Sequence, residues 1–261
     1  MPEGHSVKRS ANKFEELFQG ENVAVSSPQG RFTDSKILSG QTFLHAQPKG
    51  KQLFLHFEES ILQIHLGIYG KWSYQKGEPK EPVGQVRARF QVENRLADLR
   101  GPTICSLIDI DTHQKILERL GPDPLWDDPD GKLRKEFIAR AGAKKTPIGQ
   151  LLMDQGVISG IGNVFRAEIL FRANLSPFTP GNLVPNEVLG SIWDDSVDLL
   201  ALGVRTSVML TRENFQKVSV PKDERYWVYK REGMACRQCG NPVSIALMAA
   251  RKLYWCGFCQ K

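Results

Sequence analysis

The stretch that decides the C-terminal fold reads Cys236-Arg-Gln-Cys239 and, sixteen residues later, Cys256-Gly-Phe-Cys259. Each CxxC turn aims two sulfurs at one point, and the residues between the turns are enough for a hairpin that brings them together. Four thiolates around one ion make a closed tetrahedral site, which is structural because no position stays open for a substrate. The pattern therefore predicts a zinc ribbon that holds one structural Zn²⁺ and does no chemistry.

Two disulfides, or a chance spacing, are the alternatives to a metal site. The stretch that follows His5 is charged, unlike a secretory signal peptide, and no apolar run approaches the eighteen residues of a membrane span. A fifth cysteine, Cys105, is on its own, which suits a reducing compartment. We therefore expect reduced cysteines in a cytoplasmic protein without membrane contact.

Positive charge is concentrated in the second half of the chain. Residues 1–130 carry 16 Lys and Arg against 18 Asp and Glu, whereas residues 131–261 carry 19 against 11, which together give the net charge of +6. With 261 residues, of which 41% are hydrophobic, the chain is long enough for two domains. A basic half beside a zinc ribbon indicates a polyanionic partner, most simply nucleic acid.

Hydrophobic periodicity divides the chain into a strand-rich and a helical part. A helix is predicted over 5–19, and short apolar runs at 52–57, 61–66 and 86–92 predict strands of a sandwich or barrel within 23–110. Asp111 or Thr112 can cap a short helix that ends at Leu120, and the Asp- and Pro-rich stretch 122–130 is typical of a linker. Further helices are predicted over 132–142, 147–154, 163–173 and 185–202. We expect a mobile loop within 204–225 and a strand at 226–229 that leads into the ribbon.

The helical part contains a glycine-punctuated turn, Ser159-Gly-Ile-Gly-Asn163, between two helices. With Asn163 as N-cap, the exposed N–H groups of the second helix would form an anion site, and Gly160 and Gly162 would let a phosphate approach the backbone. An ordinary helical hairpin with glycine for packing is the alternative. The turn alone does not decide between the two.

These segments together resemble the formamidopyrimidine-DNA glycosylase/endonuclease VIII family. The resemblance rests on the start Met1-Pro-Glu-Gly-His5, on Gly50-Lys51 before a strand, on His65-Leu-Gly-Ile-Tyr-Gly70, on the Gly-Ile-Gly-Asn turn, and on the four cysteines, and it runs the length of the chain. Two further matches are Asp98-Leu-Arg-Gly-Pro102 and Arg119-Leu-Gly-Pro-Asp123. Pro-Glu-Gly, Tyr69 and Arg-Leu-Gly-Pro-Asp are more similar to the endonuclease VIII branch.

The resemblance implies an α+β multi-domain fold. Its parts would be an N-terminal β-sandwich with a flanking helix, a helical domain with a helix–two-turn–helix, and a C-terminal four-cysteine zinc ribbon. The boundaries that we expect are 2–121 for the catalytic β-sandwich domain, 122–130 for the linker, 131–212 for the helical DNA-binding domain and 226–261 for the ribbon.

The first residues can supply an amine nucleophile. An α-amine titrates near ~8 and a lysine near ~10.4, so the α-amine is the better nucleophile at neutral pH. Removal of Met1 leaves Pro2 with a secondary amine that can attack a sugar C1′. The resemblance makes Pro2 that nucleophile and Glu3 the donor of a proton to the opening deoxyribose ring. Taken alone, the two residues could simply be the start of a chain.

The same resemblance gives roles to four further residues. Lys51, otherwise a solvated hairpin lysine, would contact a phosphate and donate a proton for β-elimination. Arg251, five residues before Cys256, would grip the phosphates beside the lesion near the tip of the ribbon hairpin and assist δ-elimination. Asn163 and Arg119 match positions that bind the DNA backbone.

Ile68 and Tyr69 lie where the family inserts side chains into the gap left by an extruded base. An apolar wedge next to an aromatic ring can replace lost base stacking, although core packing is the common role of an isoleucine. Gly67 stands where the enterobacterial-type enzyme has glutamine, so part of the gap filling or of the reading of the opposite base differs here.

The sequence thus predicts a bifunctional DNA glycosylase and abasic-site lyase of base excision repair that acts on damaged double-stranded DNA. It would remove oxidised bases, with pyrimidines favoured, through a Schiff base on Pro2 and cut the strand by β,δ-elimination. One alternative is a formamidopyrimidine-type enzyme for oxidised purines. The other is a catalytically silent DNA-binding zinc protein on the same scaffold.

Overall fold

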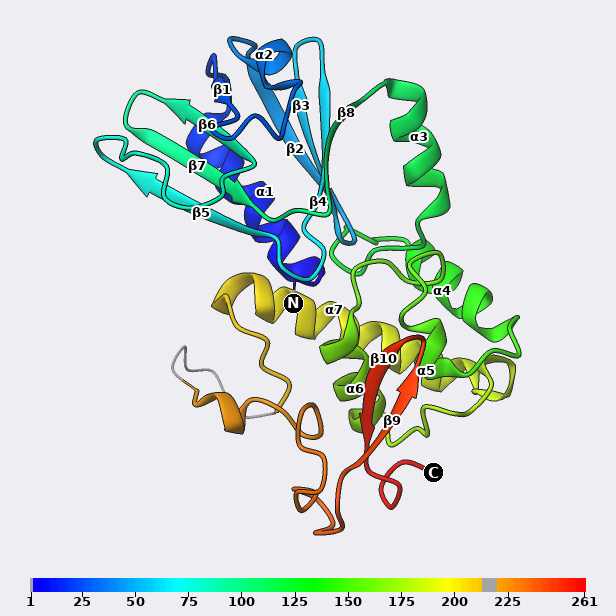
Figure 1. Cartoon of the computed structure of the whole chain (residues 1–261). Coiled ribbons are helices and arrows are strands. Elements are labelled where there is room, and N and C mark those ends of the chain that lie inside the picture. The colour runs from blue at the N-terminus through cyan, green and yellow to red at the C-terminus, as the bar shows by residue number, and fades with distance from the viewer. Residues whose placement is uncertain (1, 213–219) are drawn as a thin grey trace. The chain divides into compact units, whose positions relative to one another are not determined.

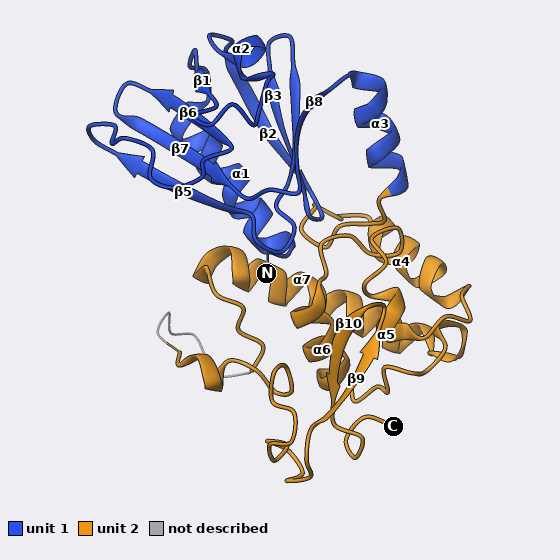
Figure 2. Cartoon of the chain, viewed as in Figure 1, with its two compact units in different colours: residues 1–119 blue, residues 120–261 orange. Residues whose placement is uncertain are grey.

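The computed structural model describes residues 2–212 and 220–261, and the predicted loop at 204–225 lies partly outside them. The chain forms two compact units, residues 1–119 and 120–261 (Figure 2). The helices after residue 120 and the cysteine hairpin belong to the same second unit. A finer division into a helical domain at 131–212 and a ribbon at 226–261 remains a prediction.

Unit 1 is a β-sandwich of two four-stranded sheets, as predicted (Figure 1). Every pairing within each sheet is antiparallel. One sheet has the order β1 (Ala24–Ser26), β6 (Ala88–Val92), β7 (Arg95–Arg100), β5 (Lys71–Lys76). The other has the order β2 (Phe43–Lys49), β3 (Gln52–Phe57), β4 (Ile61–His65), β8 (Ile104–Ile108).

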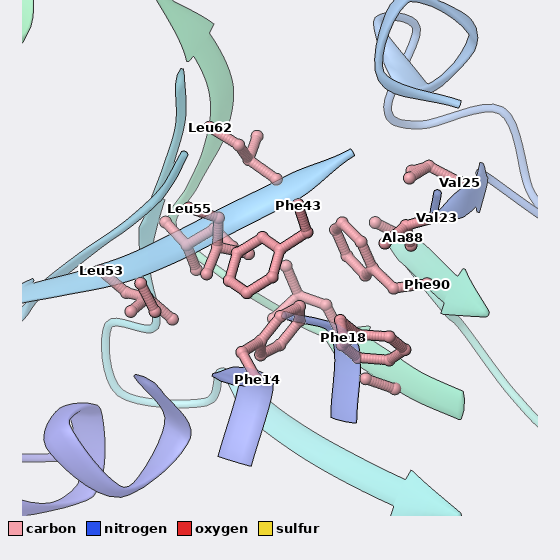
Figure 3. Close-up of a cluster of buried hydrophobic side chains, with 14 of the residues drawn as sticks. Phe14, Phe18, Val23, Val25, Phe43, Leu53, Leu55, Leu62, Ala88 and Phe90 are labelled. Carbon is pink, nitrogen blue, oxygen red and sulfur yellow. The ribbon is translucent and has the colours of Figure 1, made fainter. Parts of the chain in front are cut away.

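Helix α1 (Gly4–Phe18) packs one face against the core between the two sheets, with Phe14 and Phe18 pointing into it (Figure 3). Phe14 lies at the centre, with ring centroids 5.3 Å from Phe90 of one sheet and 6.0 Å from Phe43 of the other. Such edge-to-face pairs add to the free energy gained by burying apolar surface. The first residues of the chain are therefore anchored by the helix that directly follows them.

Two details in unit 1 differ from simple strand and helix patterns. Strand β3 buries Phe54 as well as its inward-facing leucines, because His113 of helix α3 (Ile110–Arg119) packs edge-on against Phe54 at 4.6 Å. The helix cap is Asp109, whose carboxylate accepts the N–H of Thr112 at 2.7 Å. The prediction of Asp111 or Thr112 as cap was therefore wrong by two or three residues.

Unit 2 has four α-helices and a short hairpin within the described residues. The helices are α4 (Lys132–Gly142), α5 (Ile148–Leu151), α6 (Asn163–Arg172) and α7 (Asn186–Thr206), with 3₁₀ turns at Gly181–Leu183 and Lys222–Glu224. The hairpin pairs β9 (Ser244–Met248) with β10 (Arg251–Trp255). Across the described part of the chain, no helix combines the length and apolar character needed to cross a membrane.

Two predictions about unit 2 need correction. The residues at 226–229 form an irregular stretch of bends, not a strand, because the N–H groups of 227–229 donate to the buried carboxylate of Glu168 instead of to a neighbouring strand. Helix α5 is much shorter than 147–154. The stretch 122–130 is irregular and remains a predicted linker, and the carbonyl of Pro122 at its start accepts the N–H of Ser159.

Candidate functional site

Pro2 and Glu3 lie directly before helix α1. Pro2 is half-buried and Glu3 is fully buried, and the carbonyl of Glu3 accepts the N–H of Ser6 at 2.9 Å in the first turn of the helix. Burial, with a smaller effect of Arg9, lowers the pKa of His5 to about 4. His5 is therefore a neutral imidazole at pH 7 and adds no charge beside the first residues.

Lys51 lies in the two-residue turn between β2 and β3, where Lys49 pairs with Gln52. Gly50 precedes it with φ 58°, a conformation that glycine adopts without strain. Lys51 is half-buried and acts on His65, whose pKa is lowered by burial and by the lysine charge. His65 pairs with Gln52 across the strands, so it lies at the same end of the sheet as Lys51. Sequence reasoning did not assign His65.

The loop between β4 and β5 presents Ile68 and Tyr69 to solvent. Tyr69 is 85% exposed and Ile68 is 48% exposed, so core packing is excluded for both. The loop is tight, since the N–H of Gly70 donates to the carbonyl of Leu66 at 2.9 Å and a Cβ on Gly70 would come within 2.2 Å of that oxygen. A rigid five-residue turn therefore carries two large exposed apolar side chains.

Arg119 is the last residue of α3 and is exposed. No carboxylate among residues 2–212 and 220–261 pairs with it within 4.0 Å. An exposed guanidinium without an ion-pair partner is available to an external anion.

In unit 2, Asn163 begins helix α6, and Gly162 takes the cap position. The Asn163 side chain is buried, donates to the carbonyl of Lys252 at 2.9 Å and accepts from Arg166. The N–H of Gly160 is also used, since it donates to Gln155 Oε1. The prediction of Asn163 as N-cap was therefore wrong by one residue, and its side chain bonds the hairpin strand and Arg166 instead.

Arg251 opens β10 at the tip of the hairpin, one residue from the Lys252 carbonyl that Asn163 holds. The guanidinium is exposed. The two residues between the strands, Ala249 and Ala250, have φ 51° and 55°, which is strained for alanine. The structure therefore brings the start of α6 and the arginine at the hairpin tip together within one unit.

Buried arginine and glutamate side chains hold this unit together. Arg166 is fully buried on α6 and donates to the carbonyls of Gly149, Met248 and Lys252. Neither Arg166 nor Glu168 was assigned from sequence. The signal was present as two charged residues inside the apolar run 164–171, where an unpaired charge would be costly to bury.

Glu168 is fully buried, and its carboxylate accepts three backbone N–H groups and one hydroxyl. The donors are Trp227, Val228 and Tyr229 through their N–H groups and Thr211 through Oγ1. Burial raises the pKa of Glu168, and these four hydrogen bonds act against that shift. The carboxylate thereby fixes the chain entering the ribbon.

The four ribbon cysteines converge. Their sulfurs all lie within 4.8 Å of one another, with Cys236 to Cys259 at 3.9 Å and Cys239 to Cys256 at 3.5 Å. All five cysteines of the chain are free, which excludes the disulfide alternative. A tetrahedron with Zn–S bonds of about 2.3 Å has edges of roughly 3.8 Å, so the cluster could hold a zinc ion.

Two groups of predicted residues are thus defined, one in each unit. Pro2, Glu3, Lys51, Ile68, Tyr69 and Arg119 belong to unit 1, and Asn163, Arg251 and the four cysteines belong to unit 2. In unit 1, His65 pairs with Gln52, the residue after Lys51, and in unit 2 Asn163 bonds the carbonyl of the residue after Arg251.

Comparison with known proteins places both units in one family. Residues 1–105 match the formamidopyrimidine-DNA glycosylase N-terminal domain, and residues 120–213 match the formamidopyrimidine-DNA glycosylase H2TH domain. The chain is 39% identical over 270 residues to a protein of Mycobacterium tuberculosis named endonuclease 8 1, and the match covers the whole of both chains.

Solved structures agree with this result. The Fpg protein of Thermus thermophilus superposes with a TM-score of 0.79 at 27% identity, covering 99% of this chain and 98% of that one. The Lactococcus lactis Fpg in complex with DNA containing an abasic site has a TM-score of 0.80 and covers 99% of each chain, and at 20% identity it supports the fold alone. The chain therefore belongs to the formamidopyrimidine-DNA glycosylase/endonuclease VIII family, the DNA glycosylases and abasic-site lyases of base excision repair.

Proposed function

We propose that this protein removes oxidised pyrimidines from duplex DNA with Pro2 as the nucleophile and then cuts the strand by β,δ-elimination. The observation that carries the proposal is the position of Pro2, directly before a fully buried Glu3 at the head of an anchored helix. An amine at this place is held rigidly next to a carboxyl group. Removal of Met1 is required, because it frees the amine.

The first step breaks the bond between C1′ and the base. The lone pair of the Pro2 nitrogen forms a bond to C1′, the base leaves with the electron pair of the glycosidic bond, and the sugar ring opens to an iminium. Glu3 donates a proton to the ring oxygen as it leaves. An α-amine has a neutral fraction more than a hundredfold larger than a lysine at pH 7, since their pKa values differ by more than two units, roughly 8 against 10.4.

Two eliminations then cut the strand. Loss of a C2′ proton from the iminium expels the 3′ phosphate, and Lys51 supplies a proton in this step. A second elimination expels the 5′ phosphate with assistance from Arg251, and water releases the sugar fragment and restores the amine. Burial, and the charge of Lys51 to a smaller degree, lower the pKa of His65 at this end of the sheet.

The DNA backbone is gripped by Arg119, Arg251 and the start of α6 at Asn163. The exposure of both arginines supports this role. The internal hydrogen bonds of Asn163 to Lys252 give it a second role, which is to fix the hairpin that carries Arg251. Ile68 and Tyr69 enter the gap left by the flipped base, and their exposure on a rigid turn supports that insertion.

One zinc ion is bound by Cys236, Cys239, Cys256 and Cys259. The sulfur separations of 3.5 and 3.9 Å fit tetrahedral thiolate coordination. When bound, the ion supplies folding free energy to the ribbon and no chemistry. We infer that the protein works as a monomer on chromosomal DNA in the cytoplasm.

The preference for pyrimidines separates this proposal from its nearest alternative. It rests on Pro2-Glu-Gly, on Tyr69, and on the 39% identity to a protein named endonuclease 8 1. The test offers the protein matched duplexes with thymine glycol, 5-hydroxyuracil or 8-oxoguanine, and separates the products on a denaturing gel. We expect faster excision of both pyrimidines and a product with phosphate at both ends of the gap.

Each alternative predicts a different gel. Faster excision of 8-oxoguanine would place the protein with the purine-specific enzymes. Binding to all three duplexes without any cleavage would identify a silent DNA-binding protein.

A further inference from the structure

Three of the five histidines of the chain lie together in unit 1. His45 of β2 and His56 of β3 are directly opposite each other across the strand pair, and their rings stack with centroids 4.2 Å apart and 11° between the planes. His113 of α3 packs against His56, with ring centroids 5.2 Å apart. Two strands and a helix thus bring three imidazoles into one group, which we call the histidine cluster.

His113 is the buried member of the histidine cluster. The residue is 3% exposed, and within residues 2–212 and 220–261 neither of its ring nitrogens has a hydrogen-bond partner. A neutral imidazole has one N–H donor and one acceptor, and burying both without partners costs free energy. Buried polar side chains are paired as a rule, and an unpaired one can mark the site of an ion. The nitrogens of His113 are therefore available to a ligand that binds in the cluster.

His56 has the outer hydrogen bond that is typical of a metal-binding imidazole. Its Nε2 lies 3.2 Å from Gln47 Oε1, and an amide oxygen only accepts, so Nε2 carries the proton and Nδ1 carries the lone pair. Histidines that bind metals donate their other ring N–H to such an acceptor, which fixes the tautomer. Burial, with smaller effects of the two neighbouring histidines, lowers the pKa of His56 to about 4. At pH 7 a proton therefore does not compete for this lone pair.

The rings of the histidine cluster are stacked in this structure and do not converge on one point. Among the described residues, the ribbon cysteines are the only group of three or more potential ligands whose donor atoms lie within 4.8 Å of one another. His45 is exposed, however, and an exposed side chain changes rotamer within nanoseconds, so its ring can leave the stack. Opposed residues of an antiparallel pair have Cβ atoms about 4.5–5.5 Å apart, which is close enough for two imidazoles to bind one ion.

We propose that His45, His56 and His113 bind one divalent transition-metal ion of the kind that prefers imidazole, such as Zn²⁺, Ni²⁺ or Cu²⁺. Imidazole nitrogens do not suit Mg²⁺ or Ca²⁺, which prefer oxygen ligands. The bound ion joins α3 to strands β2 and β3. This site is separate from the four cysteines, and the inference does not depend on the proposed action on DNA.

The experiment titrates the zinc-loaded full chain with Ni²⁺ at pH 7.5 and follows binding by calorimetry and by NMR of the imidazole signals. We expect one Ni²⁺ per chain beyond the ribbon zinc. The ring signals of His45, His56 and His113 should shift or broaden before those of His5 and His65. His113→Phe keeps a buried ring and removes its nitrogens. Loss of an outer partner alone costs about 10–100-fold in metal affinity, so loss of this ligand should cost at least as much.

A second measurement tests whether the ion joins α3 to the sheet. With free Ni²⁺ at about ten times its Kd, hydrogen exchange through local opening of α3 should slow roughly tenfold in the wild type, because the ion binds only the closed form. His113→Phe should show no such slowing.

The matched control is His65→Gln, at a histidine of unit 1 outside the cluster, which should keep the wild-type affinity for Ni²⁺. The NMR signals identify the ligands in the wild type, so the test does not depend on whether His113→Phe folds. A zinc-loaded wild type that binds no further Ni²⁺ would overturn the inference. Equal affinity in the wild type and His113→Phe, or signals that change only at His5 beside the N-terminal amine, would also overturn it.

Discussion

The two units of this protein differ in the interactions that stabilise their interiors. Unit 1 packs aromatic and aliphatic side chains from α1 between two sheets, with Phe14 at the centre. Unit 2 completely buries the side chains of Arg166 and Glu168, and four clustered cysteines flank its C-terminal hairpin. All five histidines of the chain lie in unit 1, and the four clustered cysteines lie in unit 2.

The proposed mechanism gives each unit a different task. The apolar sandwich of unit 1 anchors the first residues of the chain and two tight turns. The proposed nucleophile, acid and base-gap side chains therefore lie on fixed backbone. A small hairpin buries little apolar surface, so we expect a bound metal and buried polar groups to hold the arginine at its tip. We therefore expect chemistry to depend on unit 1 and the DNA grip to depend on unit 2.

Loss of the metal should have the largest effect, and only in unit 2. Cys236→Ser removes one ligand, and structural zinc in small ribbons contributes on the order of 10 kcal/mol of folding free energy. We expect hydrogen exchange to lose protection across residues 226–261 while α1 and both sheets stay protected. Metal analysis of the wild type should give one zinc per chain.

The matched control is Cys105→Ser, which alters the cysteine outside the cluster. It should leave zinc content and the protection of residues 226–261 unchanged. A wild-type protein without zinc, or a protected ribbon in Cys236→Ser, would contradict this account of unit 2.

Glu168→Gln should be the next largest change. The substitution places an NH₂ group against N–H donors and leaves some of the four hydrogen bonds of Glu168 unmade. We expect unit 2 to lose about 2–4 kcal/mol in urea unfolding. Glu187→Gln, on the exposed side of α7, should change it by less than about 0.5 kcal/mol. Equal effects from the two would mean that the buried carboxylate does not fix the chain entering the ribbon.

Arg251→Ala should affect DNA binding and δ-elimination more than base release. Removal of one phosphate contact should weaken duplex binding and reduce the slope of log K against log salt concentration by about 1. We expect δ-elimination to fall more than base release, since Arg251 acts after the base has left. Arg134, already paired with Asp194 at 2.9 Å, is the control, and its alanine variant should keep the wild-type slope. Equal loss of base release and δ-elimination would count against the division between units.

The last effect, which vanishes at neutral pH, concerns acid and unit 1. The pKa of His5 is lowered from 6.5 to about 4 by burial, so the folded state binds the proton less well than the unfolded chain. The stability that neutral His5 gives is present above pH 6.5 and is lost as the pH falls towards 4. An NMR titration should place the midpoint of His5 near 4. A midpoint near 6.5 would mean that His5 is not buried as described.

Sequence patterns predicted the helices and strands of both units well where periodicity was long. Helix α1, the strands at 52–57 and 61–65, and helix α6 lie within a residue or so of their predicted ranges. The prediction failed at 226–229, where three N–H groups bind one buried carboxylate 59 to 61 residues away in the chain. No local pattern contains that information, because a tertiary hydrogen bond decided the structure.

The candidate site shows the same limit. The cysteine spacing predicted the cluster, because four ligands at fixed separations constrain a turn geometry. The closeness of Thr103 to Gly67 could not be predicted, since it depends on two loops that only the fold brings together. Arg166 and Glu168 were visible as charges in an apolar run, but their hydrogen-bond partners lie on other elements.

The central claim is that an amine of unit 1, at Pro2, forms the covalent bond to the sugar. Its direct test is borohydride reduction of the protein on an abasic-site duplex, followed by peptide mapping of the adduct. The claim predicts one adduct at residue 2 after loss of Met1, full trapping with a C-terminal tag, none with an N-terminal tag, and retained trapping in Arg251→Ala. An adduct on Lys51, or activity with Met1 retained, would contradict it.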